Sequence, residues 1–179
     1  LRFTGKSKGE LLWQAHFLLG DKVESDPNPV LFKKEHRKLS IPALDEIAYE
    51  DAYDQLEYLG FPLCSPFDLI DPAYFDGTVD QGEFASRVGQ RVSVVGYLVH
   101  IKRTKTKGRV EQEMSFGTFM DRSGQLLDSV HFPNSLKRYR FKGKGCYLVK
   151  GKLTSDYGHI SLEADYLEKI PYDKLVKEP

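Results

Sequence analysis

Hydrophobic and polar residues follow two different periods along this chain. Over residues 10–20, and again over residues 41–60, apolar positions recur at helical spacing, and the second segment has acids in its first turn and Gly60 at its end. Residues 20–29 are acidic and rich in turn-forming residues, which predicts a connector. Three prolines within residues 61–72 prevent the second helix from continuing. The first part of the chain is therefore predicted to be helical, with linkers around its second helix.

The second part of the chain, from Gly89 to about Ile170, has the pattern of short strands. Its segments are rich in valine and aromatic residues, and turn-forming residues separate them. Gly96 lies in the middle of the first segment and indicates a bulge or a sharp bend. The five predicted strands are residues 91–101, 114–120, 125–132, 145–155 and 160–170.

A helix is predicted over residues 134–141, between the third and fourth strands, with Asn134 or Ser135 as its cap. The sequence "DRSG" at residues 121–124 predicts a tight hairpin turn, with Asp121 serving the turn itself. Five short strands with a helix after the third are typical of an OB-fold, a small Greek-key barrel.

The predicted fold class is therefore mainly β with flanking helices, an OB-fold barrel of five strands preceded by a helical and linker segment. Because the chain starts at Leu1 rather than Met, and residues 11–20 have the pattern of the end of a helix closed by Gly20, we expect it to be a fragment of a longer polypeptide. The predicted divisions are the end of an upstream helical domain at 1–20, an acidic linker and amphipathic helix at 21–76, the barrel at 77–172 and a tail at 173–179.

Charge is distributed unevenly, although 26 Lys and Arg residues balance 26 Asp and Glu residues overall. Residues 87–158 hold 15 basic residues against 5 acidic ones, a net charge of +10. Residues 1–86 hold 8 against 16, and residues 159–179 hold 3 against 5, so these blocks carry −8 and −2. A compact block of +10 favours a polyanionic partner, and a merely solubilising surface is the alternative.

The most basic stretch is "KRTKTKGR" at residues 102–109, which has five basic side chains and no acid. It falls between the first two predicted strands, and residues 155–159 fall between the last two, on the same rim of the binding groove. Single strands bind such grooves through phosphate contacts and base stacking. The candidate nucleic-acid contacts are Lys102, Arg103, Lys105, Lys107, Arg109, Phe116, Phe119, Lys152, Tyr157 and His159.

Only one of Phe116 and Phe119 can stack on a base, because strand alternation puts them on opposite faces. Asp128 is predicted to be a solvent-facing strand residue. The five histidines are scattered, and His100 and His159 are the two that can flank the groove.

The sequence contains no recognisable catalytic motif. It has no glycine-rich phosphate loop, no metal-spaced His and Cys set and no nucleophile paired with a base. The two cysteines, Cys64 and Cys146, are too far apart for a metal motif, and a reducing compartment fits them. The chain has no apolar run long enough for a membrane span. We therefore expect no catalytic residues, no metal, no cofactor and no membrane contact.

Several elements resemble the C-terminal OB-fold of the bacterial DNA polymerase III alpha subunit, the replicative polymerase of the C family. The family pattern has a valine-rich strand with a glycine, a Lys-Thr-rich loop ending Lys-Gly, a strand beginning at Met, an Asp-x-x-Gly turn, Phe-Pro before the helix and a Val-x-Gly-Lys strand. The matching elements here are Gly96, residues 104–108, Met114, Asp121 with Gly124, Phe132 with Pro133, and residues 149–152.

Residues 52–70, "AYDQLEYLGFPLCSPFDLI", are similar to the helix and exit that precede this domain in the family, although they lack the usual His-Pro pair. The resemblance covers roughly residues 44–171. It implies a non-catalytic part of a DNA-directed DNA polymerase, a nucleotidyltransferase whose palm domain lies elsewhere. The implied location is the cytoplasm, at the replisome.

The partners implied by the resemblance are single-stranded template DNA, the rest of the polymerase chain, and the sliding clamp and clamp loader. In the family a clamp-binding peptide precedes the helix, and "NPVLF" at residues 28–32 offers Leu31 and Phe32 for that contact, without the usual leading Gln. Two alternatives stay open: a protein-interaction module that docks on the clamp or clamp loader, and an anticodon-binding OB domain.

Overall fold

The computed structural model describes residues 4–20, 49–106 and 111–172. It divides the chain into two compact units, Leu1–Glu50 and Asp51–Pro179. In the first unit, helix α1 (Lys8–Gly20) begins with a capping box: the Glu10 amide donates to Ser7 Oγ over 3.2 Å, and the Ser7 amide donates to Glu10 Oε2 over 3.0 Å. This reciprocal pair fixes where the helix starts.

Helix α2 (Glu50–Tyr58) confirms the described part of the predicted second helix, since residues 41–48 lie outside the described residues. Gly60 follows it with a φ of 77°, a left-handed conformation that glycine adopts without strain. No helix in the described part of the chain is long and apolar enough to cross a membrane.

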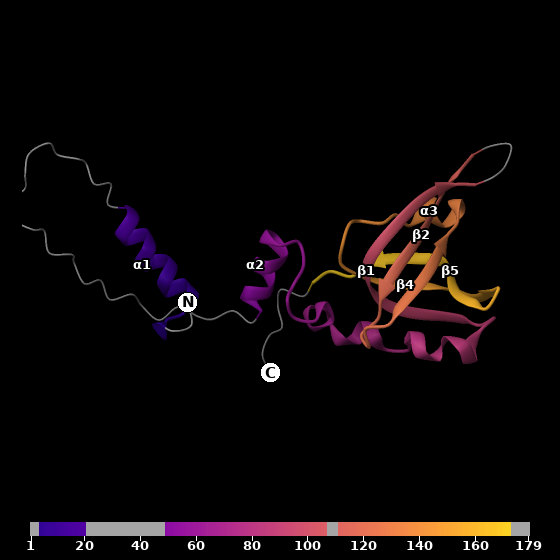
Figure 1. Cartoon of the computed structure of the whole chain (residues 1–179), viewed down its shortest axis with the longest axis horizontal. Helices are drawn as coiled ribbons and strands as arrows, with labels where there is room; N and C mark the ends of the chain where they lie inside the picture. The colour runs from indigo at the N-terminus through magenta and orange to yellow at the C-terminus, as the bar shows by residue number, and fades with distance from the viewer. Residues whose placement is uncertain (1–3, 21–48, 107–110, 173–179) are drawn as a thin grey trace, which may run out of the picture. The chain divides into compact units, whose positions relative to one another are not determined.

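The second unit contains a closed five-stranded barrel with the strand order β1-β2-β3-β5-β4 (Figure 1). Every pair is antiparallel except β3 with β5, which is parallel. This order, with a helix between β3 and β4, is that of an OB-fold, so the predicted fold class is confirmed. The elements are β1 (Arg91–Lys105), β2 (Glu113–Met120), β3 (Leu126–His131), α3 (Pro133–Arg138), β4 (Cys146–Asp156) and β5 (His159–Lys169).

Strand β1 belongs to two sheet partners in succession. Its first half, Arg91–Tyr97, pairs with β4, and its second half, Tyr97–Lys105, pairs with β2. The strand therefore runs four residues past the predicted end, so residues 102–105 are strand rather than loop. The register of β1 with β2 shifts between Leu98 and His100, whereas the sequence predicts an irregularity at Gly96. A glycine suits position 96 for a different reason, because a Cβ there would lie 2.8 Å from Phe119 Cβ.

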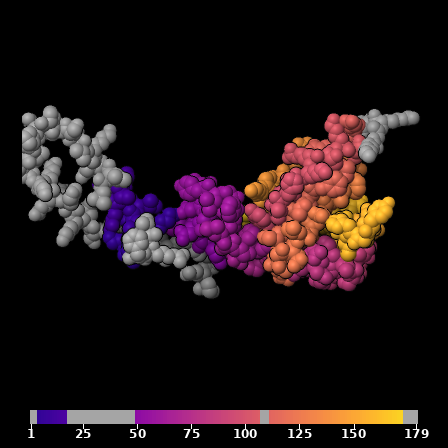
Figure 2. Space-filling view, viewed as in Figure 1, coloured from indigo at the N-terminus to yellow at the C-terminus, as the bar shows by residue number. Residues whose placement is uncertain are grey.

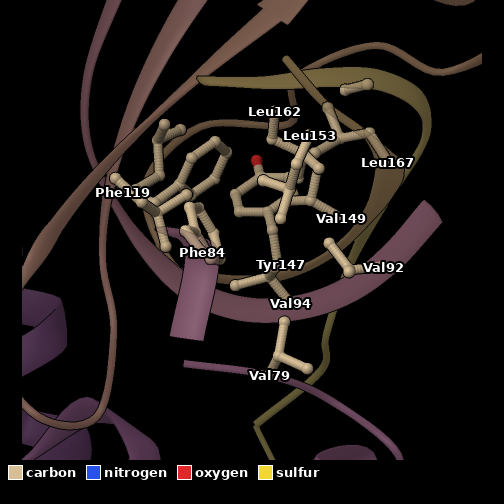
Figure 3. Packing of buried hydrophobic residues seen from close by; sticks show 13 residues of the cluster. Val79, Phe84, Val92, Val94, Phe119, Tyr147, Val149, Leu153, Leu162 and Leu167 are labelled. Carbon is tan, nitrogen blue, oxygen red and sulfur yellow. The ribbon is translucent and has the colours of Figure 1, made fainter. Parts of the chain in front are cut away.

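The barrel interior is filled by apolar side chains from all five strands (Figure 3). Tyr147 is fully buried at its centre, and its hydroxyl donates to the Gly143 carbonyl over 2.5 Å and accepts from the Lys142 amide over 2.8 Å. Burial raises the pKa of this hydroxyl. The other labelled members of the cluster are Val79, Phe84, Val92, Val94, Phe119, Val149, Leu153, Leu162 and Leu167.

Three short 3-10 helices lead into the barrel and pack against it: η2 (Pro66–Leu69), η3 (Pro72–Phe75) and η4 (Gln81–Arg87). Phe84 of η4 belongs to the barrel core, and Phe67 of η2 belongs to a second apolar cluster with barrel residues. Figure 1 shows this segment running along one end of the barrel. The proline-rich segment that follows α2 is therefore packed against the barrel rather than being a free linker.

Helix α3 begins at Pro133, with Phe132 as its N-cap residue and no side-chain cap. The predicted caps, Asn134 and Ser135, are wrong. Proline is favoured at the first helical position because its fixed φ suits the helix and its missing N–H would have no partner there. The helix therefore starts before either predicted cap.

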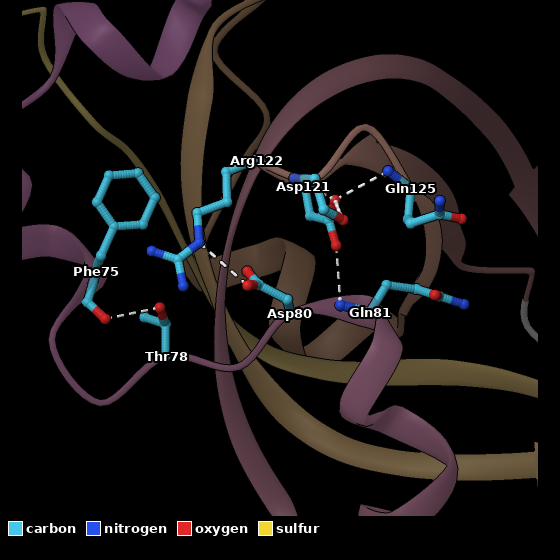
Figure 4. A network of polar contacts seen from close by, with 8 residues as sticks. Phe75, Thr78, Asp80, Gln81, Asp121, Arg122 and Gln125 are labelled. Atoms are coloured by element: carbon cyan, nitrogen blue, oxygen red, sulfur yellow. Dashed lines mark hydrogen bonds and ion pairs between the residues drawn. The ribbon is translucent and has the colours of Figure 1, made fainter.

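Asp121 anchors the β2–β3 turn and ties it to η4 (Figure 4). Its buried carboxylate accepts the Gln81, Ser123 and Gln125 amides, each over 2.9 Å, and the Ser123 hydroxyl over 2.6 Å. Burial alone would raise the pKa of Asp121, but these hydrogen bonds lower it below its usual value. The predicted turn role of Asp121 is confirmed, and the bond to Gln81 extends it.

Replacing Asp121 by alanine is expected to lower the free energy of unfolding by about 2 kcal/mol, since it removes the charged acceptor of three backbone amides at this turn. Urea denaturation measures the change. Asp80→Ala is the control, because the Asp80 side chain forms a half-exposed ion pair with Arg122 over 3.1 Å. Its loss should cost less than about 1 kcal/mol. Equal losses in the two variants would contradict an anchoring role for Asp121.

Candidate nucleic-acid interface

The alternation of β2 assigns the two candidate phenylalanines to different environments. Phe119 has no exposed surface and belongs to the barrel core, whereas the Phe116 side chain is 40% exposed on the outer face. A fully buried ring cannot stack on a base, so Phe119 is corrected to a core residue. Phe116 is the phenylalanine of this pair that a base can reach.

Phe116 lies in a row of side chains that crosses the outer face of three strands. Strand register places Lys102 of β1 on one side of Phe116 and Val130 of β3 on the other. Directly opposed residues have Cβ atoms about 4.5–5.5 Å apart, so Lys102 and Val130 each adjoin Phe116. Within the described residues Lys102 makes no ion pair. The row is thus an aromatic and aliphatic platform beside an unpaired cation.

Two residues further along, the next row is polar. It runs from His100 through Thr118 to Asp128. The Asp128 carboxylate accepts the Thr118 hydroxyl over 2.8 Å and lies 3.2 Å from His159 Nε2. Asp128 is half-exposed, as predicted for a solvent-facing strand position. It is therefore a fixed acceptor next to the apolar platform.

The β4–β5 hairpin presents Tyr157 at its tip, with the side chain fully exposed. Tyr157 has a φ of 51° and Gly158 a φ of 84°. Two-residue hairpin turns with both residues in this region favour Asn or Gly first, and a bulky residue there is uncommon. An aromatic ring therefore stands at a position whose backbone conformation disfavours bulky residues, and burial of the ring does not compensate, because the side chain is fully exposed.

The end of β1 and the start of β2 lie at one end of the outer face, and the β4–β5 hairpin lies at the other. The prediction that residues 102–109 and 155–159 share one rim is therefore wrong for the described residues. Lys105 of β1 pairs with Glu113 at the start of β2, while His159 contacts Asp128 near the far end. In Figure 2 the outer ends of β1 and β2 and the β4–β5 hairpin form separate projections of the barrel surface. By strand register, Phe116 lies between Glu113 at one end and the row of Thr118 and Asp128 toward the other.

The basic stretch is divided between two faces because its described residues alternate along a strand. Lys102 opposes Phe116 on the outer face, whereas Arg103 opposes the buried Ser115. The Lys105 ammonium forms an ion pair with the Glu111 carboxylate over 2.7 Å. Arg103 Nε lies 3.9 Å from a Glu113 carboxylate oxygen.

Of the remaining predicted contacts, the described one, Lys152, does not join this face. Lys107 and Arg109, like Leu31 and Phe32, lie outside the described residues. Lys152 lies on β4, opposite Arg91 and Glu163, and lines a pocket of about 680 Å³ on another side of the barrel.

Sequence reasoning missed two members of the face, Val130 and Thr118, and did not connect Asp128 with His159. Alternation in residues 125–132 could have identified Val130, because it has the parity of Asp128. The contact between Asp128 and His159 depends on the parallel pairing of β3 with β5, for which the sequence has no local signal.

Metal ligands do not gather anywhere in the described ranges: no group of three or more His, Cys, Asp or Glu side chains could hold an ion there. His131 is buried in the barrel, where its Nε2 lies 2.8 Å from the Ser129 hydroxyl. Cys146 is also buried, and burial raises the pKa of its thiol to about 12. His131 is packed inside the barrel and Cys146 in the second apolar cluster with Phe67, so neither side chain is presented to a substrate.

Comparison of the chain with protein-family models found no match, and comparison with curated proteins found none either.

Proposed function

We propose that the outer face of β1, β2 and β3 binds single-stranded nucleic acid. The observation that carries this proposal is the exposed Phe116 ring, which lies on a strand between Lys102 and Val130. Single-strand binding sites combine aromatic rings, on which bases stack, with cations along the backbone path. The OB-fold uses this part of its surface for oligonucleotides.

Each group of the face has a role in this proposal. A base stacks on Phe116, and a second base stacks on Tyr157 at the end of the face. Lys102, together with the net positive charge of residues 87–158, neutralises phosphates. Asp128, held by Thr118 and His159, repels phosphates but accepts hydrogen bonds from base amino groups. The acid therefore orients bases toward the protein and the backbone toward Lys102.

We further propose that the chain is a non-catalytic C-terminal part of a C-family replicative DNA polymerase, in which this face holds the single-stranded template. The resemblance of residues 44–171 to the alpha subunit supports this assignment. An anticodon-binding role would require RNA, so equal-length DNA and RNA oligonucleotides separate the two functions. Preference for RNA through 2′-hydroxyl contacts would favour the anticodon-binding alternative.

Phe116→Ala and Tyr157→Ala are each expected to weaken binding of a single-stranded DNA oligonucleotide by about 1–3 kcal/mol, since each removes one stacking ring. Neither variant should change the dependence of log affinity on log salt. Lys102→Gln should instead flatten that slope by about 0.7, the amount expected for one lost phosphate contact. Fluorescence anisotropy at two salt concentrations measures both quantities.

Tyr58→Ala is the matched control, because Tyr58 is an exposed tyrosine on α2 and outside the face. It should bind the oligonucleotide as the original chain does. Unchanged affinity in both Phe116→Ala and Tyr157→Ala, with melting temperatures also unchanged, would show that the face is not the strand-binding surface.

A second candidate function, docking on another protein of the replisome, is favoured by one observation. Four large apolar side chains are exposed within six residues at the end of α2: Tyr58, Leu59, Phe61 and Leu63. Exposed apolar groups of this kind often mark interaction sites. Pull-down with purified sliding clamp, comparing the original chain with Leu59→Ser/Leu63→Ser, tests this candidate independently of DNA binding.

A further inference from the structure

A pocket of about 510 Å³ opens beside the outer halves of β1 and β2, next to α3. Its volume is in the range of small-molecule and nucleotide sites. The pocket is separate from the Phe116 platform, because it contains Arg103 and Ser115, which alternate along their strands with Lys102 and Phe116. The lining residues are Arg103, Gln112, Glu113, Ser115, Pro133, Leu136, Lys137, Arg140 and Phe141.

Positive charge dominates this pocket. Arg103, Lys137 and Arg140 line it against a single acid, Glu113, which lies 3.9 Å from Arg103 Nε. Within the described residues, Lys137 and Arg140 have neither an ion-pair partner nor a side-chain hydrogen bond. Three converging cations repel one another, and an anion between them removes that repulsion and supplies acceptors.

Gln112 and Ser115 are the polar uncharged lining residues, and the other three are apolar. Leu136 and Pro133 come from α3, and Phe141 follows it. The Phe141 ring packs 4.7 Å from the His131 ring and 6.3 Å from the Phe119 ring, so the barrel core holds its position. Such a wall offers a surface for a planar ring, while the cations offer contacts for a charged group.

We propose that this pocket binds a nucleoside phosphate. Arg103, Lys137 and Arg140 hold the phosphate, and the nucleoside lies against Phe141 and Leu136. Arginine suits this role because its planar guanidinium can contact two phosphate oxygens. The ligand is either a free nucleotide or one nucleotide of a bound strand, and both sources present the same chemistry to the pocket.

The first test titrates the ¹⁵N-labelled chain with thymidine 5′-monophosphate, and with thymidine as the probe without phosphate. The monophosphate should shift the backbone amides of Ser115, Leu136 and Phe141, and thymidine should shift them at least tenfold less at equal concentration. Lys137→Gln/Arg140→Gln should weaken monophosphate binding at least tenfold. Arg138→Gln/Lys144→Gln is the matched control: it removes the same charge from neighbouring exposed side chains that do not line the pocket, and should bind as the original chain does.

The second test measures single-stranded oligonucleotide affinity in the same two double variants. If the monophosphate leaves the pocket amides unshifted but only Lys137→Gln/Arg140→Gln weakens oligonucleotide binding at least tenfold, the pocket takes a nucleotide of the strand and the proposal stands. Equal binding of thymidine and its monophosphate would overturn it. So would the absence of any effect of Lys137→Gln/Arg140→Gln on either ligand. Because Phe116 lies outside this pocket, Phe116→Ala tests the outer face separately.

Discussion

Replacing Gly151 by alanine is expected to lower the free energy of unfolding by about 3 kcal/mol or more. Gly151 lies where the register of β4 and β5 shifts, and it faces the backbone of β5. A Cβ at this position would lie 2.1 Å from the Glu163 carbonyl oxygen and 2.9 Å from the Ala164 Cα. These are backbone atoms, which cannot move without breaking the β4–β5 pairing.

Chemical denaturation of Gly151→Ala measures this loss, and Gly82→Ala is its control. Gly82 lies in η4 without a positive φ, and a Cβ added to it would meet nothing within 4 Å. Its replacement should therefore change stability by less than about 0.5 kcal/mol. A Gly151→Ala variant as stable as Gly82→Ala would mean that β4 and β5 do not approach each other this closely in solution.

The second large effect concerns pH. His131 has no exposed surface, and burial lowers its pKa from 6.5 to about 4. Between these values the unfolded chain binds a proton that the folded chain does not. Above about pH 6.5 His131 is neutral in both states and does not reduce the free energy of unfolding. As the pH falls from 6.5 toward 4, the proton bound by the unfolded chain lowers the free energy of unfolding. One pKa unit corresponds to about 1.4 kcal/mol, so the loss amounts to about 3 kcal/mol.

Denaturation of the original chain and of His131→Gln at pH 7 and pH 4 checks this prediction. Other titrating groups contribute equally to both proteins, so the variant should lose about 3 kcal/mol less between the two pH values. His131→Phe is a second variant that keeps an aromatic ring beside Phe141. If both variants lose as much stability between pH 7 and pH 4 as the original chain does, then the protonation of His131 does not cause the loss.

Local patterns predicted the barrel, because each strand has its own alternation. The β2 alternation separated Phe116 from Phe119, and exposure then decided which ring is outside. Residues 102–105 escaped prediction because this part of β1 lacks a buried face, so its charged residues resembled a loop. Pro133 displaced the expected caps of α3 by offering the helix an earlier start.

Long-range features of the site could not be predicted in the same way. The contact between Asp128 and His159 joins residues on β3 and β5 whose proximity is fixed by barrel closure. The pocket around Arg140 likewise combines β1, β2 and α3, and only the alternation of β1 turns Arg103 toward it. Nothing in the charge pattern alone distinguishes Lys102 from Arg103.

The last strand in the chain has a consequence for folding order. Strand β5 pairs with both β3 and β4 and contributes the buried Leu162, Ala164 and Leu167. During synthesis from the N-terminus, the barrel therefore stays open at two strand edges until β5 has left the ribosome. Closure joins β3 to a strand about thirty residues later, so we expect it to be a late and slow step, as for other non-local pairings. Chains released from the ribosome that end before His159 should remain sensitive to protease, and released chains that extend past Ile170 should be resistant.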